Sequence, residues 1–563
     1  MADLKEELKK FADFRESGQY GRFKERPIAY FCAEYALDKC RPMYSGGLGV
    51  LAGDVVREAA DQNLPMVAVG LFYRNGYVCP PKEVGGRRIE MCDNHEPQDY
   101  GFVRAKDDHD EDVYVLVPIQ DRMIKVAVWQ KNDAGISFYA LDTNCEENAP
   151  QDRSITGRLY VGDKVMRLKQ EIILGIGGMR ALEAMEIHPS VYHLNEGHSA
   201  LLAYELIHHQ MHERHLGFDE AKQYARRRIV MTNHTLVAAG NEIYSYDLVA
   251  MMLQRYAESL SVPVHDLITM GLVQESNEFS LSMLAFRMAS VVNAVSKLHA
   301  AKAKEIWHNH PMVGITNGVH IPFWDQVGDE KAVHGEFWKA HQEKKRQLLA
   351  LVKEKTGKEW GEDDLIIGWA RRIVTYKRPT AMFEEAERLS EICRRSDRPV
   401  RILFSGHPHP SDDRGADLVK ELIDRSNGEQ SDIMAYLEDY SMDSAKLMIS
   451  GCDVWLNTPI VGYEACGTSG MKAALNGVLT CSTQDGWVAE ADMTHAGWIL
   501  GNDFIGGGLC DKIEAEIAPM YFERNADGVP EVWEEYMLRS REMILDSFTA
   551  TRMLREYLDM LYV

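Results

Sequence analysis

The sequence predicts an α/β protein with at least two domains. Its 563 residues exceed what one hydrophobic core normally serves. Short apolar runs alternate with amphipathic stretches of helical period, which is the rhythm of parallel α/β units. Hydrophobic residues make up 45% and charged residues 26% of the chain, as in ordinary globular proteins.

Six short apolar runs are predicted to be buried strands followed by helices. They are residues 26–31, 191–194, 228–232, 365–369, 400–404 and 454–457. Polar or glycine-rich turns follow several of them, including Asn195-Glu-Gly-His198, Thr232-Asn-His-Thr235 and Ser405-Gly-His407. Ligands of open α/β sheets bind at such strand ends, so we expect the functional residues there.

A domain boundary is predicted near Thr316-Asn-Gly-Val-His-Ile-Pro322, where Asn-Gly and Pro interrupt the pattern. We therefore expect an N-terminal Rossmann-like domain over residues 1–320 and a C-terminal one over residues 321–545. Two such domains facing each other would enclose a cleft from which water is excluded. Residues 546–563 are predicted to be a C-terminal helix that can cross back to the first domain.

The charge of the chain argues against nucleic acid and membrane partners. The formal net charge is −23, whereas binding to phosphate backbones or anionic lipids needs a basic surface. The N-terminus lacks the apolar core of a signal peptide, so a cytoplasmic location is expected. The ten cysteines include no CxxC pair, which favours reduced thiols over disulfides or a zinc site.

The most informative segment is Glu464-Ala-Cys-Gly-Thr-Ser-Gly-Met-Lys472, in which a glycine-rich loop opens a helix that carries a lysine in its first turn. The first turn, at Thr468 and Ser469, would present free backbone N–H groups to a phosphate. Lys472 could bond covalently to the aldehyde of a phosphorylated cofactor, namely pyridoxal phosphate. The alternative is an ordinary capped helix after a loop.

A second segment, Gly368-Trp-Ala-Arg371-Arg372-Ile-Val-Thr-Tyr-Lys377-Arg378, places four cations after a buried strand. Such a cluster is costly when empty and useful when an anion neutralises it. Phosphate is the natural ligand, because arginine offers a planar fork and lysine a compact charge. The alternative is a solvated basic face.

Two weaker patterns have structural alternatives. Ser45-Gly46-Gly47-Leu-Gly49 precedes a helix and could bring backbone N–H groups to an anion or a sugar hydroxyl, or could be a structural turn. The His-rich stretch His208-His-Gln-Met-His212 has no recognised zinc spacing and is expected to be a solvated helix end. We assign no metal.

Together these segments resemble the α-glucan phosphorylases, which include glycogen and maltodextrin phosphorylase. The matching motifs run in order through most of the chain. Their amino-acid sequences are similar to those of the shorter bacterial and archaeal branch of the family. They lie at residues 43–54, 159–163, 167–171, 193–198, 232–235, 315–318, 371–378, 436–440 and 464–477, continuing to Asp485-Gly486.

The resemblance implies the two-domain GT-B glycosyltransferase fold and pyridoxal 5′-phosphate bound as a Schiff base to Lys472. The 5′-phosphate of the cofactor would exchange a proton with inorganic phosphate, which attacks an α-1,4-glucan and gives glucose 1-phosphate with retention. Arg372 and Lys377 match positions that grip substrate phosphate, with Gly47 as a backbone donor. The matching positions for the glucosyl unit and its surroundings are Gly46, Glu196, His234, Asn317, Glu464, Cys466 and Gly467, and those for the cofactor pocket are Trp324, Arg371, Tyr440, Thr468 and Ser469.

Some positions depart from the family pattern. Cys466 replaces a frequent serine and Glu196 a frequent aspartate, and neither change threatens the mechanism. Ser441 stands where animal enzymes carry an arginine, and His407 where a lysine is expected, so both could alter phosphate affinity. The chain is shorter than the family norm, so the regulatory elements of longer enzymes are not expected.

The leading hypothesis is therefore an α-glucan phosphorylase, a glycosyltransferase acting on glucan and phosphate. One alternative is a nucleotide-sugar-dependent glucan synthase of the same fold, which has no use for a cofactor aldehyde at Lys472. Another is a catalytically silent relative, disfavoured because Arg372, Lys377, Glu464 and Lys472 are all present. The preferred glucan stays open, and a homodimer is the commonest assembly for such enzymes.

Overall fold

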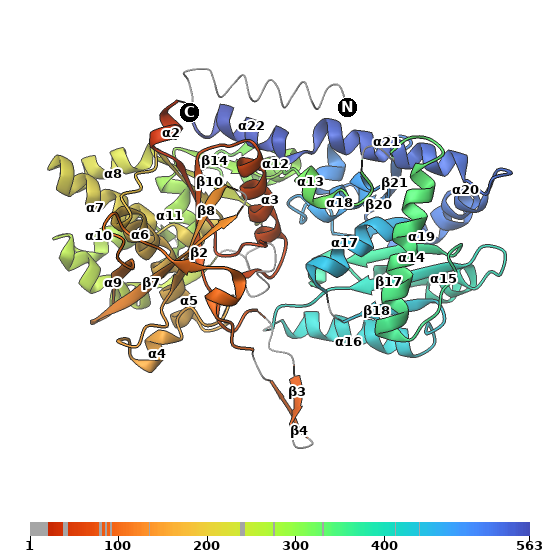
Figure 1. Ribbon diagram of the computed structural model, residues 1–563, viewed down its shortest axis with the longest axis horizontal. Helices are drawn as coiled ribbons and strands as arrows, with labels where there is room; N and C mark the ends of the chain where they lie inside the picture. Colours follow the sequence, from red (N-terminus) through yellow and green to blue (C-terminus); the bar gives the residue numbers. More distant parts are fainter. Residues whose placement is uncertain are drawn as a thin grey trace. The chain divides into compact units, whose positions relative to one another are not determined.

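The computed structural model divides the chain into two compact units, each built around its own sheet (Figure 1). It describes residues 21–37, 43–77, 93–133, 135–236, 242–273, 276–328, 332–410, 412–438 and 440–563, and the backbone of the strands at 81–84 and 87–90. Unit 1 takes the described residues within Met1–Val295, Ala300–Ile315 and Leu554–Val563. Unit 2 takes those within Ser296–His299 and Thr316–Met553.

Unit 1 is built on a ten-stranded sheet with the order β15-β14-β10-β9-β1-β2-β8-β7-β5, in which β6 also pairs with β7. The strands from β15 to β8 are parallel, and β5, β6 and β7 form an antiparallel edge. Their bounds are β1 Ile28–Phe31, β2 Met66–Leu71, β5 Val103–Arg104, β6 Tyr114–Ile119, β7 Arg122–Asp133, β8 Ile136–Asp142, β9 Val191–Asn195, β10 Ile229–Asn233, β14 Val291–Ala294 and β15 Val313–Gly314.

Helices accompany this sheet, and two smaller sets of strands lie apart from it. The helices are α2 Arg22–Glu25, α3 Gly47–Asp61, α4 Pro150–Arg153, α5 Lys164–Ile172, α6 Gly178–Ala184, α7 Leu202–Arg214, α8 Phe218–Arg226, α9 Tyr246–Ser259, α10 Val264–Thr269, α11 Leu281–Met288 and α12 Lys297–Ile306. The smaller sheets combine β11 Ile243–Ser245 with β12 Leu272–Val273 and β13 Glu278–Ser280, and β3 Pro81–Val84 with β4 Arg87–Glu90.

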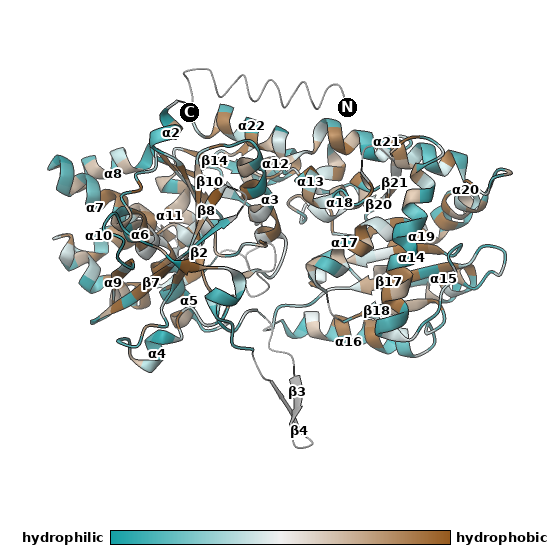
Figure 2. Ribbon diagram, viewed as in Figure 1, coloured by the Kyte–Doolittle hydropathy of each residue, from teal (hydrophilic) through white to brown (hydrophobic). Residues whose placement is uncertain are grey.

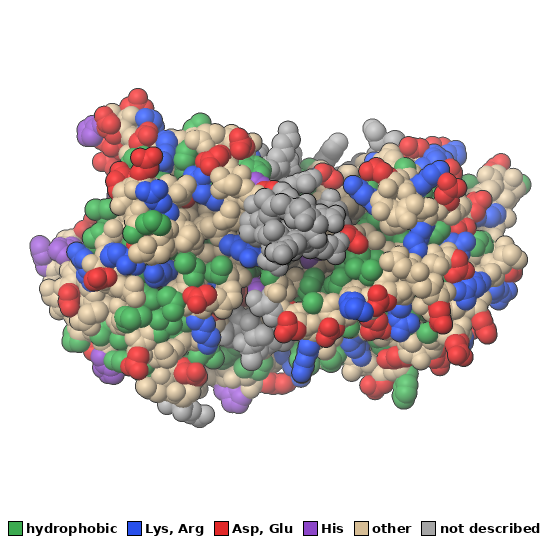
Figure 3. Space-filling view, turned by 90° about the horizontal axis from the view of Figure 1, so that it is seen from below, with side chains coloured by type: hydrophobic (Ala, Val, Ile, Leu, Met, Phe, Trp, Pro, Cys, Tyr) green, Lys and Arg blue, Asp and Glu red, His purple; other side chains and the backbone are tan. Residues whose placement is uncertain are grey.

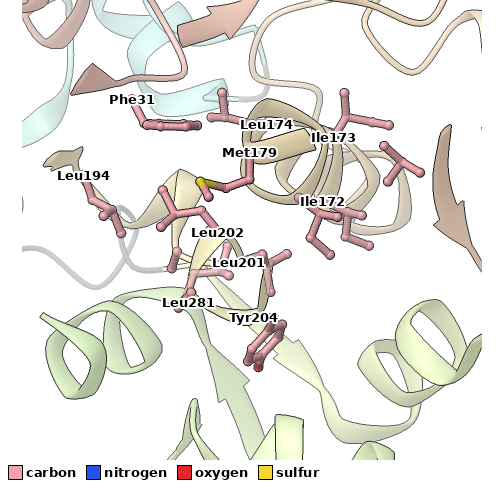
Figure 4. Packing of buried hydrophobic residues seen from close by; sticks show 14 of the residues in the cluster. Phe31, Ile172, Ile173, Leu174, Met179, Leu194, Leu201, Leu202, Tyr204 and Leu281 are labelled. Carbon is pink, nitrogen blue, oxygen red and sulfur yellow. The ribbon is translucent and has the colours of Figure 1, made fainter. Parts of the chain in front are cut away.

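The core of unit 1 lies beneath the ends of its central strands. Figure 4 shows Phe31 of β1 and Leu194 of β9 near Met179 and Leu202, which come from the helical segments that cover the sheet. These side chains are almost completely buried. The residues that follow β1 and β9 are therefore held by a close-packed interior.

Unit 2 contains a six-stranded, entirely parallel sheet with the order β18-β17-β16-β19-β20-β21. In chain order this is 3-2-1-4-5-6, the order of the doubly wound Rossmann fold. The strands are β16 Leu365–Ala370, β17 Val400–Ser405, β18 Met434–Leu437, β19 Val454–Asn457, β20 Leu479–Thr483 and β21 Gly497–Leu500. The helices are α13 Ile321–Trp324, α14 Phe337–Thr356, α15 Ala386–Cys393, α16 Asp413–Asn427, α17 Met442–Gly451, α18 Thr468–Leu475, α19 Ile505–Lys512, α20 Ala518–Phe522 and α21 Glu531–Ser547. The last helix, α22 Ala550–Met560, begins in unit 2 and continues from Leu554 in unit 1.

The sequence pattern explains why these runs become buried strands. All six residues of β16 are buried, as expected for a central parallel strand covered on both faces. Figure 2 shows β17 and β18 in brown, whereas α14 carries both teal and brown residues. Each of the six predicted strands is present, and the predicted α/β class is confirmed.

The last residues of the chain pack into unit 1. Tyr557 and Tyr562 are fully buried, and the Tyr562 hydroxyl lies 2.7 Å from His193 Nδ1. His193 Nε2 lies 2.7 Å from the Thr232 hydroxyl, so this imidazole joins β9, β10 and the C-terminal segment. Burial lowers the pKa of His193 to about 3, which keeps the ring neutral.

The surface is strongly charged but mixed in sign. On the face shown in Figure 3, Lys and Arg side chains (blue) are interspersed with Asp and Glu side chains (red). None of the described helices is both long enough and apolar enough to cross a membrane.

Candidate functional site

The central strands of unit 2 bring the basic and glycine-rich segments to one place. Strands β16 and β19 are neighbours in the sheet, and the strand order reverses between them. Arg371 follows β16, and the segment from Thr458 to Glu464 follows β19. Ligands of doubly wound sheets bind at this switch point, outside the carboxyl ends of the strands.

Glu464 pairs with two of the four clustered cations. Its Oε2 lies 2.9 Å from Arg371 Nη2 and 2.9 Å from Lys377 Nζ. Arg371 and Lys377 are buried, whereas Arg372 is exposed. The four cations thus do not form one solvated face, because two of them share a carboxylate beneath the surface.

Burial sets the protonation of this group. Desolvation and then the nearby Arg371 guanidinium lower the pKa of Lys377 to about 7, although Glu464 opposes the change. Burial alone would raise the pKa of the Glu464 carboxyl, but Arg371 and Lys377 outweigh it and hold that pKa below its usual value. The site therefore keeps an ionised carboxylate beside a lysine that titrates near neutral pH.

Arg371 has hydrogen-bonding capacity that the described protein atoms do not use. Its Nε and Nη1 atoms are buried and have no hydrogen-bond partner there. A Cβ atom added to Gly467, which precedes helix α18, would lie 3.6 Å from Arg371 Nη2. The guanidinium thus lies against the N-terminus of α18, where backbone N–H groups and the helix dipole favour an anion.

Helix α18 also carries the predicted cofactor lysine, Lys472, which is its fifth residue and lies in the second turn rather than in the predicted first. Gly467 precedes it with φ +85°, a conformation that glycine adopts without strain. Lys472 is buried, and its Nζ lies 4.1 Å from the centre of the Trp324 ring. Asn476 Nδ2 donates to the carbonyls of both Trp324 and Lys472, at 2.9 and 2.8 Å. Trp324 and Lys472 are therefore held together by one buried amide.

The residues around the start of α18 are fixed by short contacts. Thr468 is the first residue of the helix, and Ser469 Oγ accepts a hydrogen bond from Trp455 Nε1 at 3.4 Å. The backbone N–H of Asn317 donates to the buried Cys466 thiol. Asn317 Oδ1 is buried without a partner among the described atoms, so it is available to a ligand hydroxyl.

The two departures near the phosphate positions have local roles. Ser441 caps helix α17, where its Oγ accepts from Ser444 N–H at 3.3 Å and its own N–H donates to Ser444 Oγ at 2.8 Å. The backbone N–H of Tyr440 donates to His407 Nε2 at 3.4 Å. Tyr440 is therefore held by the residue that stands in place of the expected lysine.

In unit 1, the glycine-rich turn is held by Glu34, three residues after β1. Glu34 Oε2 accepts from the N–H groups of Ser45 and Gly46 at 2.5 and 3.2 Å, and its Oε1 accepts from the Tyr160 hydroxyl at 2.9 Å. Added Cβ atoms at Gly46 and Gly47 would meet nothing within 4 Å. The backbone here is open to the approach of a ligand, at the start of α3.

Glu196 and His234 follow the adjacent strands β9 and β10. Glu196 Oε2 accepts from the His234 N–H at 2.8 Å, and His234 Nε2 lies 2.5 Å from Asn195 Oδ1. Glu196 has φ +73° and ψ 176°, a strained conformation for a non-glycine residue. Burial raises the pKa of its carboxyl to about 7. Strain and burial at one carboxylate are typical of functional sites.

One group in the described part of the chain brings possible metal ligands together. Atoms of Glu171, His198 and Glu242 lie within 4.8 Å of one another. Arg167 Nε lies 2.7 Å from Glu242 and 3.4 Å from Glu171, so a guanidinium already supplies positive charge to these carboxylates. We assign no metal to this group.

Comparisons with known proteins show which family the chain resembles. A family model described as carbohydrate phosphorylase matches residues 315–497, which include β16, β19 and α18. Maltodextrin phosphorylase of Thermococcus litoralis is 36% identical over 96% of this chain and 70% of its own length. Glycogen phosphorylase of Aquifex aeolicus is 31% identical over 96% of this chain and 86% of its own length. The chain belongs to the carbohydrate phosphorylase family.

A shorter relative extends the comparison. An uncharacterized protein of Methanocaldococcus jannaschii is 28% identical to this phosphorylase over 95% of the chain and 100% of its own length. The predicted family, its glycosyltransferase class and its α/β fold of the GT-B type are confirmed.

Two motif residues, Arg378 and Asp485, position the site of this phosphorylase through contacts that the sequence does not indicate. Arg378 donates to the carbonyls of Thr458 and Pro459, both at 2.8 Å, and to that of Asn502 at 2.6 Å, and so ties together the loops after β16, β19 and β21. Asp485 Oδ2 accepts from the Glu464 N–H at 2.9 Å. Both residues lie inside motifs that match the family, and this match was the signal that could have indicated them. Their hydrogen-bond partners are distant in sequence, so the contacts themselves could not be predicted.

Proposed function

We propose that this phosphorylase catalyses the reversible phosphorolysis of α-1,4-glucans, with pyridoxal 5′-phosphate bound through Lys472. The observation that carries the proposal is Arg371: its guanidinium lies close to Gly467, which precedes the helix that carries Lys472, and its buried Nε and Nη1 atoms have no partner among the described protein atoms. A buried guanidinium with free donors beside a helix N-terminus fits a phosphate group.

The residues present fit the cofactor. Lys472 Nζ lies against the face of Trp324, a flat apolar surface of the kind that an aromatic ring packs on. Lys472 would hold the aldehyde, and Arg371 with the Thr468 and Ser469 segment would hold the 5′-phosphate. Bound pyridoxal phosphate would supply a phosphate group that exchanges protons with the substrate phosphate.

The remaining residues of unit 2 would bind the reactants. Lys377 and Arg372 would neutralise inorganic phosphate, and their preorganised charge would stabilise the charge that develops as the glycosidic bond breaks. Glu464, Asn317 and Cys466 would bind hydroxyls of the transferred glucosyl unit. Inorganic phosphate would donate a proton to the glycosidic oxygen as the bond from that oxygen to the anomeric carbon breaks. A phosphate oxygen would then bond to the anomeric carbon with retention, and the glucan shortened by one unit would leave.

Unit 1 offers its own candidate groups for binding the glucan. Gly46 and Gly47 would offer N–H groups from the turn that Glu34 holds, and Glu196 and His234 would contact the sugar side. A homodimer and a cytoplasmic location, both expected from the sequence, remain predictions.

The decisive experiment is borohydride reduction of the protein followed by peptide mass spectrometry. We expect a phosphopyridoxyl adduct on Lys472 that is lost in Lys472→Arg and retained in Lys420→Arg, a control lysine on an exposed helix face. Phosphate-dependent release of glucose 1-phosphate from maltoheptaose should accompany the adduct. No adduct in protein expressed with ample pyridoxal phosphate, together with glucan elongation from a nucleotide sugar, would establish the synthase instead.

A further inference from the structure

Tyr463 is an exposed aromatic residue next to the reaction centre. It directly precedes Glu464, and 50% of its surface is exposed. It lies outside the buried hydrophobic cluster of unit 2, so the core does not account for an aromatic side chain here. Val461, two residues earlier, is also partly exposed, at 39%.

The turn that carries Tyr463 is firmly held. The Ile460 N–H donates to the Tyr376 carbonyl at 2.9 Å, and the Tyr463 N–H donates to the Ile460 carbonyl at 3.0 Å. The Val461 N–H donates to Asn502 Oδ1 at 3.1 Å. The backbone that presents the Tyr463 ring is thus already ordered, which limits the entropy lost when a ligand binds to it.

A continuous row of contacts joins this ring to the cationic group. The Tyr463 and Tyr376 rings lie 6.3 Å apart with 30° between their planes. Lys377 Nζ lies 5.3 Å from the centre of the Tyr376 ring and 2.9 Å from Glu464 Oε2. The two tyrosines therefore extend from the proposed phosphate and glucosyl site towards solvent.

We propose that Tyr463, with Tyr376 behind it, forms a platform for a glucosyl unit of the α-glucan beyond the unit that is transferred. The inference rests on the proposed function. A pyranose ring presents a face of C–H groups, which packs on the electron-rich face of an aromatic ring. A tyrosine adds a large apolar contact at a low cost in side-chain entropy. The neighbouring Glu464 favours a polyhydroxylated sugar over a purely apolar ligand.

The test compares Tyr463→Ala with Tyr463→Phe, which keeps the ring and removes the hydroxyl. Tyr224→Ala is the matched control, because Tyr224 is a partly exposed tyrosine on helix α8 of unit 1. KM and kcat are measured for maltoheptaose and for inorganic phosphate. The dissociation constant of maltoheptaose is measured by calorimetry on the purified enzyme without phosphate.

Tyr463→Ala should raise both the KM and the dissociation constant for maltoheptaose by about 3- to 10-fold, the worth of one aromatic contact. The kcat and the KM for phosphate should change less than about twofold, because the lost contact stabilises ground and transition states equally. Tyr463→Phe and Tyr224→Ala should resemble the wild type.

Two results would overturn the platform. One is an unchanged maltoheptaose affinity in Tyr463→Ala. The other is an equal rise in the phosphate KM, which would show that Tyr463 only positions its neighbour Glu464. If the wild-type enzyme fails to release glucose 1-phosphate, the proposed function fails, but the calorimetric comparison still decides whether Tyr463 binds glucan.

Discussion

Replacing Glu464 by glutamine should destabilise unit 2 severely, because this carboxylate is the counter-charge of two buried cations. Two unit charges 2.9 Å apart interact by about 6 kcal/mol at an effective dielectric near 20. Part of that energy offsets the desolvation of the ions. Removing one partner of a buried pair typically costs about 3–5 kcal/mol. Arg371 is left uncompensated, whereas Lys377, whose pKa is already lowered to about 7, can lose its proton, so we expect a loss near the lower end of that range.

The assay is urea unfolding followed by tryptophan fluorescence, with and without millimolar inorganic phosphate. Asp424→Asn is the control, because it breaks an exposed i, i+4 pair with Lys420 and should cost less than about 0.5 kcal/mol. Phosphate should stabilise Glu464→Gln more than the wild type, since the anion supplies the missing negative charge. The reasoning is refuted if Glu464→Gln unfolds like Asp424→Asn, or if phosphate stabilises both proteins equally.

Three further predictions concern protonation and positioning. Lys377, with a pKa of about 7, loses its positive charge as pH rises above 7. Inhibition of the enzyme by sulfate, an anion that resembles phosphate, should therefore weaken from about pH 6 to about pH 8. Lys377→Arg keeps its charge throughout and should make this inhibition nearly independent of pH. Burial raises the pKa of Glu196 from 4.5 to about 7, so between these pH values the folded protein holds a proton that the unfolded chain has lost, and its stability falls as pH rises. Glu196→Gln lacks this titration, so from pH 4 to pH 8 its unfolding free energy, measured with urea, should rise by about 3 kcal/mol relative to that of the wild type. No relative rise would contradict the assignment. Arg378→Ala removes hydrogen bonds to the Thr458 and Asn502 carbonyls and should lower the unfolding free energy by about 2–3 kcal/mol. The control is Arg388→Ala, at an exposed arginine, which should change the unfolding free energy by less than about 1 kcal/mol. Equal losses in the two variants would contradict the positioning role of Arg378.

Most of the strands that the sequence revealed are short apolar runs, although the equally buried runs of β2 and β18 were not predicted. Strands β16 and β19 are buried along their whole length, so their composition alone distinguishes them. Strands such as β21, whose residues alternate between buried and partly exposed, carry a weaker signal. The order 3-2-1-4-5-6 depends on which strands pair across the sheet, and that information is not local in sequence.

The features of the candidate site likewise fall into those that local sequence indicates and those that depend on distant residues. The placement of Lys472 in α18 followed from a glycine-rich loop before a helix, which is local chemistry. The contacts of Arg371 with Glu464 and of Glu34 with Ser45 join different loops, so spacing alone could not indicate them. That Ser441 could alter phosphate affinity stays a prediction. Its contacts in the structure cap helix α17, a role that the Ser441-x-x-Ser444 spacing indicates.

The return of Leu554–Val563 to unit 1 determines when this protein can finish folding during synthesis. Tyr557 and Tyr562 are buried in unit 1, and Tyr562 contacts His193, but the ribosome makes them after the whole of unit 2. At usual rates of translation, the apolar surface around His193 stays uncovered for on the order of tens of seconds. Unit 2 needs no later segment beyond Met553, so it can complete its core first although it is synthesised second. A nascent unit 1 is therefore the part of the chain that a chaperone would need to protect.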